Sequence, residues 1–181
     1  MKKIISAALL LAAFASAHAE TFNFSYTFAD GPAVTGSLTG HLVGDLVEGV
    51  SNVHINFNGT DFAGALSGAS WSAVTHDWSS AAGAVVSTNA AKNNFIFADA
   101  DPQHNAADVS TQFYFVNSRD ALIGNQAYAV NWNNGDIAFD QPTRNATWSL
   151  VAAPVPEPAS TAMLLAGLGL VGTFALRRRQ A

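Results

Sequence analysis

The chain contains no cysteine, and its central part contains very few cationic residues. The lack of cysteine excludes disulfide bonds, cysteine zinc sites, thiol catalysis and a lipid-modified N-terminal cysteine. Five of the eight Lys and Arg residues lie at the two ends of the 181-residue chain, so residues 20–155 hold three cations against twelve acids, a net charge of −9. Such a segment cannot neutralise a run of phosphates, which excludes a basic nucleic-acid-binding protein.

The first 19 residues have the three zones of a secretory signal peptide. A pair of lysines forms a positive n-region, and the apolar run of residues 4–14 is too short to span a membrane as a mature helix. Ala17 and Ala19 then provide the small residues of a cleavage site. We therefore predict that signal peptidase cleaves before Glu20 and that the mature chain is exported.

The C-terminal end has the pattern of a membrane helix. Residues 159–176 carry no charge, and 18 helical residues at about 1.5 Å each span roughly 27 Å, close to the thickness of the hydrocarbon core. The segment has no polar stripe at the helical period, which a core helix would show. Arg177–Arg179 follow directly, and such a cluster stays on the cytoplasmic side. The pattern predicts a transmembrane helix that leaves residues 20–153 outside the cytoplasm as one domain.

A Pro-Glu-Pro sequence, Pro156, Glu157 and Pro158, stands just before this helix. Proline fixes φ and pushes the preceding residue into extended geometry, so we expect an extended peptide that a protease cleft can accept. Together, the Pro-Glu-Pro sequence, the apolar helix and the cationic cluster resemble the PEP-CTERM sorting signal of exported proteins of Gram-negative bacteria. The resemblance covers only the C-terminal tail, residues 154–181, and its cationic positions are Arg177, Arg178 and Arg179.

The resemblance implies a partner enzyme and a destination. In that family an exosortase, a membrane protease, recognises the tail and removes it as the protein passes to the cell surface or the exopolysaccharide matrix. Pro156, Glu157 and Pro158 would then form a recognition site for another enzyme rather than a catalytic site. Before processing, the helix would anchor the protein in the inner membrane.

The body, residues 20–153, is predicted to be all-β. Phe22, Phe24 and Tyr26 alternate with polar residues, the period-two pattern of a half-buried strand, and pairs such as Asn58-Gly59 favour tight turns. Strands are predicted over residues 22–28, 34–43, 53–57, 70–78, 95–97, 112–117, 128–132 and 145–151. This pattern predicts an antiparallel β-sandwich with a jelly-roll-like strand order.

One dense polar cluster spans residues 99–108. Its carboxylates, Asp99, Asp101 and Asp108, are candidate ligands for calcium, which favours six to eight oxygen ligands. The cluster lacks the glycine and the terminal glutamate of a twelve-residue calcium loop, and Asp, Asn and Pro are also the residues of an ordinary surface turn. Both interpretations stay open, and we expect no other cofactor.

The four tryptophans have two interpretations. Flat aromatic faces can pack against sugar rings, but a sandwich core of this size also needs large aromatic side chains. Trp132 alternates with Tyr128 and is predicted to be buried, whereas Trp78 has polar neighbours and is predicted to be exposed. Trp71 and Trp78 are the candidate ligand-binding residues. An exposed, coplanar pair would favour glycan binding, and burial of all four, with Trp148, would count against it.

The body shows no catalytic motif. It has no Gly-x-Ser-x-Gly sequence and no paired histidines with the spacing of a zinc helix. We expect a protein without enzymatic activity, located on the cell surface or in the extracellular, exopolysaccharide-containing matrix. The alternative is a glycan-binding module of that matrix. A secreted hydrolase is the third hypothesis, and it needs a Ser, Asp or Glu within hydrogen-bond reach of one of four histidines: His41, His54, His76 and His104.

Overall fold

The structure is a computed structural model that describes residues 19–154. The expected signal peptide with Ala17, the Pro-Glu-Pro sequence, the expected membrane helix and the arginine cluster lie outside the described residues. Within residues 19–154, no helix is long and apolar enough to cross a membrane.

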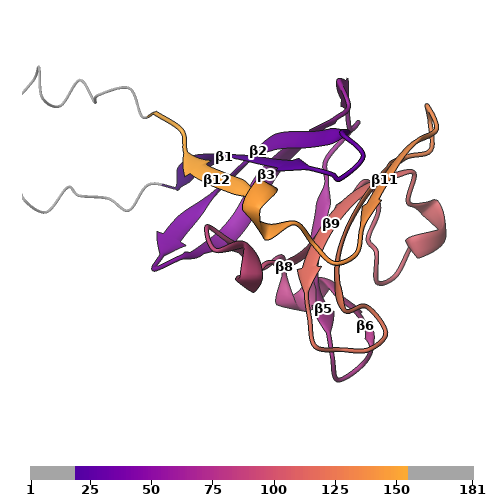
Figure 1. Ribbon diagram of the computed structural model, residues 1–181. Coiled ribbons are helices and arrows are strands. Elements are labelled where there is room, and N and C mark those ends of the chain that lie inside the picture. Colours follow the sequence, from indigo (N-terminus) through magenta and orange to yellow (C-terminus); the bar gives the residue numbers. More distant parts are fainter. Residues whose placement is uncertain (1–18, 155–181) are drawn as a thin grey trace, which may run out of the picture.

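The described chain forms two antiparallel sheets of six strands each (Figure 1). Sheet A has the order β12-β1-β2-β3-β4, with β7 paired to β3, and sheet B has the order β11-β10-β9-β8-β5-β6. The strands of sheet A are β1 (Glu20–Thr27), β2 (Ala33–Val43), β3 (Leu46–Phe57), β4 (Thr60–Asp61), β7 (Val86–Ser87) and β12 (Ser149–Ala152). Those of sheet B are β5 (Ser67–Ser72), β6 (Asp77–Ser79), β8 (Asn94–Ala98), β9 (Thr111–Asn117), β10 (Asn125–Asn131) and β11 (Asp136–Asp140).

The all-β prediction is confirmed, but the expected jelly-roll-like strand order is wrong. Strands that follow one another in the sequence pair with one another, from β1 to β4 in sheet A and from β8 to β11 in sheet B. A jelly roll would instead send consecutive strands to opposite sheets. Tight turns at residues 44–45 and 58–59 join some of these strands, whereas the longer loop of residues 99–110 joins β8 to β9. Two later strands return from sheet B to sheet A: β7 pairs with β3, and β12 pairs with β1 at the edge.

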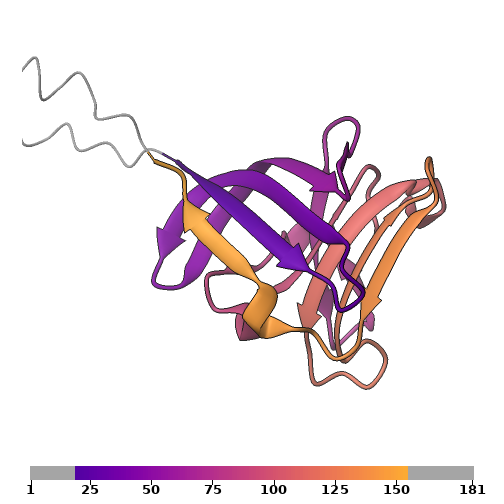
Figure 2. The same ribbon diagram turned by 45° about the horizontal axis from the view of Figure 1, so that its top comes forward.

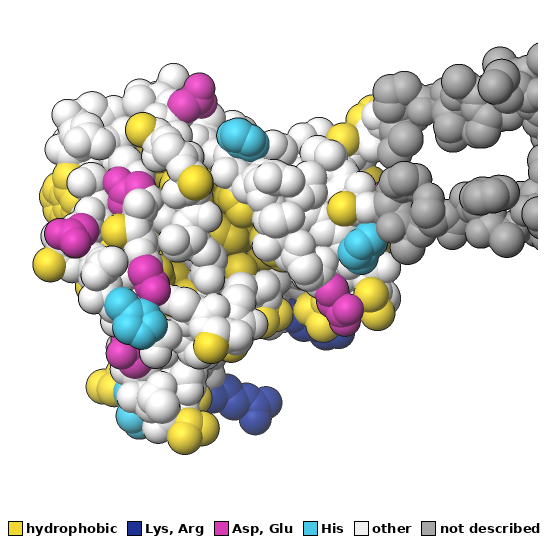
Figure 3. All heavy atoms as spheres, turned by 180° about the vertical axis from the view of Figure 1, so that it is seen from behind, with side chains coloured by type: hydrophobic (Ala, Val, Ile, Leu, Met, Phe, Trp, Pro, Cys, Tyr) yellow, Lys and Arg dark blue, Asp and Glu magenta, His cyan; other side chains and the backbone are white. Residues whose placement is uncertain are grey.

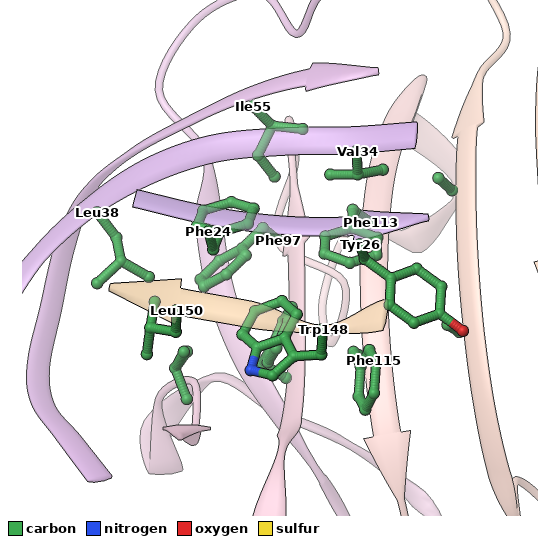
Figure 4. Packing of buried hydrophobic residues seen from close by; sticks show 14 of the residues in the cluster. Phe24, Tyr26, Val34, Leu38, Ile55, Phe97, Phe113, Phe115, Trp148 and Leu150 are labelled. Carbon is green, nitrogen blue, oxygen red and sulfur yellow. The ribbon is translucent and has the colours of Figure 1, made fainter. Parts of the chain in front are cut away.

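The core lies between the two sheets and is mainly aromatic (Figure 4). Alternation along β1 turns one set of side chains inward, and the inward sets of β8 and β9 meet them from the other sheet. Trp148, just before β12, stacks on Phe24 with ring centroids 5.8 Å apart and lies 5.4 Å from Phe115. The largest fully buried side chains are Tyr26, Phe22, Phe28, Phe57, Phe95, Phe97, Phe113 and Phe115.

A buried polar link joins the two sheets. The Tyr26 hydroxyl on β1 donates a 2.7 Å hydrogen bond to Asp140 Oδ2 on β11, and the Arg144 N–H donates to the same hydroxyl at 2.9 Å. Asp140 Oδ1 accepts from the Ala29 N–H at 3.0 Å. Burial raises the pKa of the Tyr26 hydroxyl, which therefore stays protonated and keeps its role as donor.

Of two turns in the structure, one was predicted from the local sequence and the other was not. Asn58 and Gly59 join β3 to β4 with φ values of 51° and 88°, so the predicted tight turn is confirmed. The single strand predicted over residues 70–78 is wrong, because β5 and β6 form a hairpin there. His76 in its turn adopts φ = 54°, a conformation that the sequence does not signal.

The two ends of the described chain leave the body side by side (Figure 2). β12 pairs with β1 so that Phe22 lies opposite Ala152, and the Ala153 N–H donates to the Thr21 carbonyl at 2.7 Å. The body therefore stays hydrogen-bonded up to the residue before Pro154.

Candidate functional site

The outer face of sheet B carries apolar side chains where a solvent-facing strand normally carries polar ones. β9 is apolar on both sides: Phe113 and Phe115 point into the core, while Tyr114 points outward from a position directly opposite Ile96 of β8. Tyr114 also lies opposite Tyr128 of β10. Directly opposite residues share a face of the sheet, so these side chains line up across the strands.

The rings form one continuous chain, which we call the aromatic row: Trp71, Trp78, Tyr114, Tyr128 and Phe139. The tryptophans of β5 and β6 are 5.5 Å apart between ring centroids, and Trp78 lies 5.6 Å from Tyr114. The two tyrosines are 5.4 Å apart, and Phe139 of β11 ends the row 6.3 Å from Tyr128. The row therefore crosses almost the whole width of sheet B, over a small second core of Ala69, Ile96 and Ala98.

The rings of the row are partly open to solvent. Phe139 is 47% exposed, and the other four rings are half-buried. The planes of the two tyrosines are tilted by 32° with respect to each other, and Trp71 and Trp78 meet edge to face at 83°. The candidate pair is therefore in contact and half-open, but it is not the coplanar platform that would favour glycan binding most simply.

The other two tryptophans, Trp132 and Trp148, differ clearly in solvent exposure. Trp148 is 8% exposed and belongs to the core. The predicted burial of Trp132 is wrong, since it is 57% exposed. It lies one residue beyond Asn131, the last residue of β10, so the alternation of the strand no longer decides where its side chain points.

One carboxylate holds the tryptophan end of the row in place. Asp120 Oδ2 accepts from Trp71 Nε1 and contacts His76 Nδ1, both at 2.8 Å, while Oδ1 accepts from the Leu122 N–H at 3.0 Å. The Asp120 side chain is only 4% exposed, but the His76 ring is 52% exposed. The bond from the Leu122 N–H, followed by those from Trp71 and His76, lowers the pKa of Asp120 to about 2.

The middle of the row is partly desolvated. Burial, with a smaller contribution from Tyr128, raises the pKa of Tyr114 to about 12, and burial also raises the pKa of Tyr128. Both phenols therefore remain neutral at physiological pH, and the row is an uncharged surface with hydroxyl groups at its centre.

Two carboxylates of the acidic cluster of residues 99–108 are engaged in hydrogen bonds with neighbouring protein groups. Asp99 accepts from the Ser110 and Thr111 N–H groups at 2.9 and 3.1 Å. Asp101 accepts from Ser80 Oγ and from the Gln103 N–H, and it contacts His104 Nδ1 at 2.7 Å. Nothing in the described part brings Asp108 together with these two, and no group of three or more His, Asp or Glu residues within residues 19–154 is arranged to hold a metal ion.

Two histidines lie within hydrogen-bond reach of a carboxylate, which is the contact that the hydrolase hypothesis requires. His76 contacts Asp120, and His104 contacts Asp101. In the second group the carboxylate lies between Ser80 and the histidine, whereas an activated serine needs the histidine in the middle. Within residues 19–154, neither imidazole makes a hydrogen bond to a serine or threonine hydroxyl, so neither group is an assembled nucleophile and base.

The described body contains few positive charges, and its Lys and Arg residues are Lys92, Arg119 and Arg144. On the face seen in Figure 3, acidic side chains are scattered among uncharged polar ones, and a hollow in its centre has a hydrophobic floor. Lys92 is paired with Asp45 at 2.7 Å. The body therefore offers hydrogen-bonding and apolar groups rather than a cationic surface.

The two low-pKa carboxylates predict how the body responds to acid. The hydrogen bond from Ser80, followed by those from His104 and the Gln103 N–H, lowers the pKa of Asp101 to about 2, as in Asp120. An unfolded aspartate has a pKa of about 3.9, so both groups stabilise the fold above that pH, and this stabilisation disappears as the pH falls through about 2. The urea midpoint should therefore decrease between about pH 4 and pH 2.

Substitution tests this assignment. The D101N/D120N variant should have a lower midpoint at pH 7 and a smaller decrease between pH 4 and pH 2. E48Q removes an exposed carboxylate without touching either set of hydrogen bonds, so it should keep the wild-type pH dependence. An unchanged acid response in the double variant would show that other groups control it.

Comparison with known proteins identifies the tail. Residues 154–179 match the model of the PEP-CTERM protein-sorting motif. The tail is a PEP-CTERM sorting motif. No curated protein and no solved structure matches the chain, so the role of the body rests on its own residues and geometry.

The PEP-CTERM motif establishes how the chain is handled. It marks an exported protein that is sorted by an exosortase, a membrane protease, and that passes through the membrane with a C-terminal tail. The motif begins at Pro154, directly after Ala153, whose N–H donates to the Thr21 carbonyl of β1. The folded sheet and the PEP-CTERM motif are therefore directly adjacent in the chain.

Proposed function

We propose that the chain is a non-enzymatic protein of the cell surface or exopolysaccharide matrix, and that its body binds neutral glycan chains through the aromatic row. Signal peptidase would release the N-terminus before Glu20, and the exosortase would remove the tail at the Pro-Glu-Pro sequence. No resident cofactor takes part in this proposal.

The observation that carries this proposal is the aromatic row itself. Aromatic rings bury large areas, and their flat faces can pack on the apolar faces of sugar rings. The outer faces of a β-sandwich are normally in contact with water and carry polar side chains. A row of apolar side chains from five strands on such a face therefore indicates an interaction surface. Asp120 supports the proposal because it fixes both the Trp71 ring and the half-exposed His76 imidazole, which reduces the ordering that binding would require.

The charge of the body supports a neutral ligand. Its net charge of −9 would repel an acidic polysaccharide, and its three cations are Lys92, Arg119 and Arg144. The exosortase-dependent tail supports a location where polysaccharide is present. The arrangement of Ser80, Asp101 and His104 supports a binding role over a hydrolytic one, because the serine donates to the carboxylate instead of to the imidazole.

Binding measurements on two ends of the row test this function. W78A and F139A should each weaken binding of the exported protein to soluble neutral polysaccharide at least tenfold, or about 1.4 kcal/mol, because Trp78 connects the tryptophan end of the row to Tyr114 and Phe139 forms the other end. Affinity electrophoresis with a panel of neutral and acidic polysaccharides, including polysaccharide extracted from the native host, provides the measurement.

The control is L42A, which removes an exposed apolar side chain from sheet A, 45% exposed and outside the row. It should leave affinity unchanged. Equal affinity in the wild type, W78A and F139A would contradict a role for the row, as would a preference for acidic polysaccharide.

A further inference from the structure

The outer face of sheet A, opposite the aromatic row, carries a groove of about 800 Å³. Its floor is formed by β12, β1, β2 and β3, and one wall is formed by Asp61 at the end of β4 together with Phe62 and Gly64. Ligand pockets in proteins usually have volumes of about 300–1,000 Å³, so the groove is large enough to hold an organic ligand.

Strand alternation lines this groove mainly with uncharged polar groups. Two cross-strand rows stand in register on the outer face, because residues directly opposite each other point to the same side. One row contains Val151, Asn23, Ser37 and His54, and the other contains Ser149, Ser25, Thr35, Asn56 and Asp61. Positions two apart along a strand are about 6.6 Å apart, so the rows form two parallel lines of hydrogen-bonding groups.

The hairpin holds the wall side of the second row rigidly. Asn56 Nδ2 donates to Asp61 Oδ1 at 2.7 Å, and Asn56 Oδ1 accepts from the Gly59 N–H at 3.0 Å. The Asn58-Gly59 turn fixes this geometry. Within the described part, Asp61 Oδ2 and the exposed His54 ring have no hydrogen-bond partner. Oriented groups with unused hydrogen-bonding capacity are what a polar ligand requires.

The chemistry of the lining selects the class of ligand. No Lys or Arg lines the groove, and its single charge is the Asp61 carboxylate, which disfavours an anion. Amides, hydroxyls and one carboxylate together donate to and accept from ligand hydroxyl groups. Val151, 56% exposed, and Phe62 add apolar contacts at opposite sides. A molecule with many hydroxyl groups and apolar C–H faces fits both features.

We propose that this groove is a second binding site, independent of the aromatic row, for a short stretch of a neutral saccharide. Because the two sites lie on opposite outer faces of the sandwich, one domain would hold two saccharide chains at once. Joining two chains through one rigid body raises their effective local concentration without further contacts.

Titration of the exported protein with neutral oligosaccharides at millimolar concentration, followed by amide NMR, tests the site. The expected result is shifts at Asn23, Ser37 and Asn56. S37Y should fill the floor and remove binding, and D61N, which keeps the shape, should weaken it at least tenfold. T21Y is the matched control, since Thr21 is an exposed outward residue of β1 outside the groove, and it should bind normally.

The row variants separate this proposal from the function proposed above. W78A and F139A should leave the groove shifts intact even where they weaken polysaccharide binding. Shifts confined to sheet B, no shift with any oligosaccharide, or equal losses in S37Y and T21Y would overturn the second site. Shifts produced by a polar peptide but by no oligosaccharide would overturn the assigned ligand class.

Discussion

Replacing Trp148 with alanine is expected to lower the free energy of unfolding by about 3–5 kcal/mol, the usual cost of removing a buried tryptophan. Its ring contacts three core phenylalanines, Phe24, Phe95 and Phe115, at centroid distances of 5.4–5.8 Å. Its Nε1 also donates a 2.8 Å hydrogen bond to the Ser87 carbonyl. The substitution therefore removes packing between the sheets and leaves a buried acceptor without its donor.

Urea unfolding followed by far-UV circular dichroism measures this loss. W132A is the matched control, because it removes the same side chain from a position that is 57% exposed, and its effect should stay within about 0.5 kcal/mol. Similar losses in the two variants, or a loss below about 1 kcal/mol in W148A, would contradict the assignment of Trp148 to the core.

Replacing Glu157 with alanine should stop removal of the tail while export continues. Glu157 lies between two prolines inside the PEP-CTERM motif, so its carboxylate is the one charged group of the Pro-Glu-Pro sequence. The substitution leaves the apolar segment and the arginine cluster unchanged. The mass of the protein recovered from the native host should then include residues up to Ala181, whereas the wild type should be shorter.

E48A is a suitable control, because it removes an exposed carboxylate of the body and should be processed normally. Replacing Arg177–Arg179 with serine should have a different effect, namely weaker retention and orientation, since those charges resist translocation. A wild-type protein that keeps its tail in cells with active exosortase would indicate a permanent anchor instead.

Local patterns predicted most of the longer strands, but they missed β11, whose pattern is inverted, and the two-residue strands β4 and β7. β1 alternates aromatic and polar residues, so its burial could be read directly from the sequence. β11 turns Ile137 and Phe139 outward and Ala138 and Asp140 inward. Local sequence gives no reason to expect an acidic residue at a buried strand position. The groups that form hydrogen bonds with Asp140 belong to residues more than 100 positions away in the sequence, so the strand could not be recognised from its own residues.

The candidate site was only partly predictable for a similar reason. Trp71 and Trp78 could be selected by residue type, but the three other members of the row, Tyr114, Tyr128 and Phe139, could not be connected to them without the strand order. One signal was present, since residues 112–117 lack a clear polar face, and a strand that is apolar on both sides is usually covered on both sides. The groove on sheet A depends on register between four strands, which no local pattern specifies.

The position of β12 determines how the body would respond to mechanical force. Among the described strands, β12 pairs with β1 alone and forms the edge of sheet A, and the PEP-CTERM motif begins two residues after its end. Tension applied through the tail would pull at Ala152 first and would separate the residue pairs between β12 and β1 one after another towards Ser149. Breaking the pairs in sequence requires less force than breaking all of them at once by shear. Peeling would then reach Trp148, whose buried ring resists extraction from the core. The body would therefore unfold under force in two steps. β12 would detach from β1 at a low force, and extraction of the Trp148 ring from the core would require a higher force.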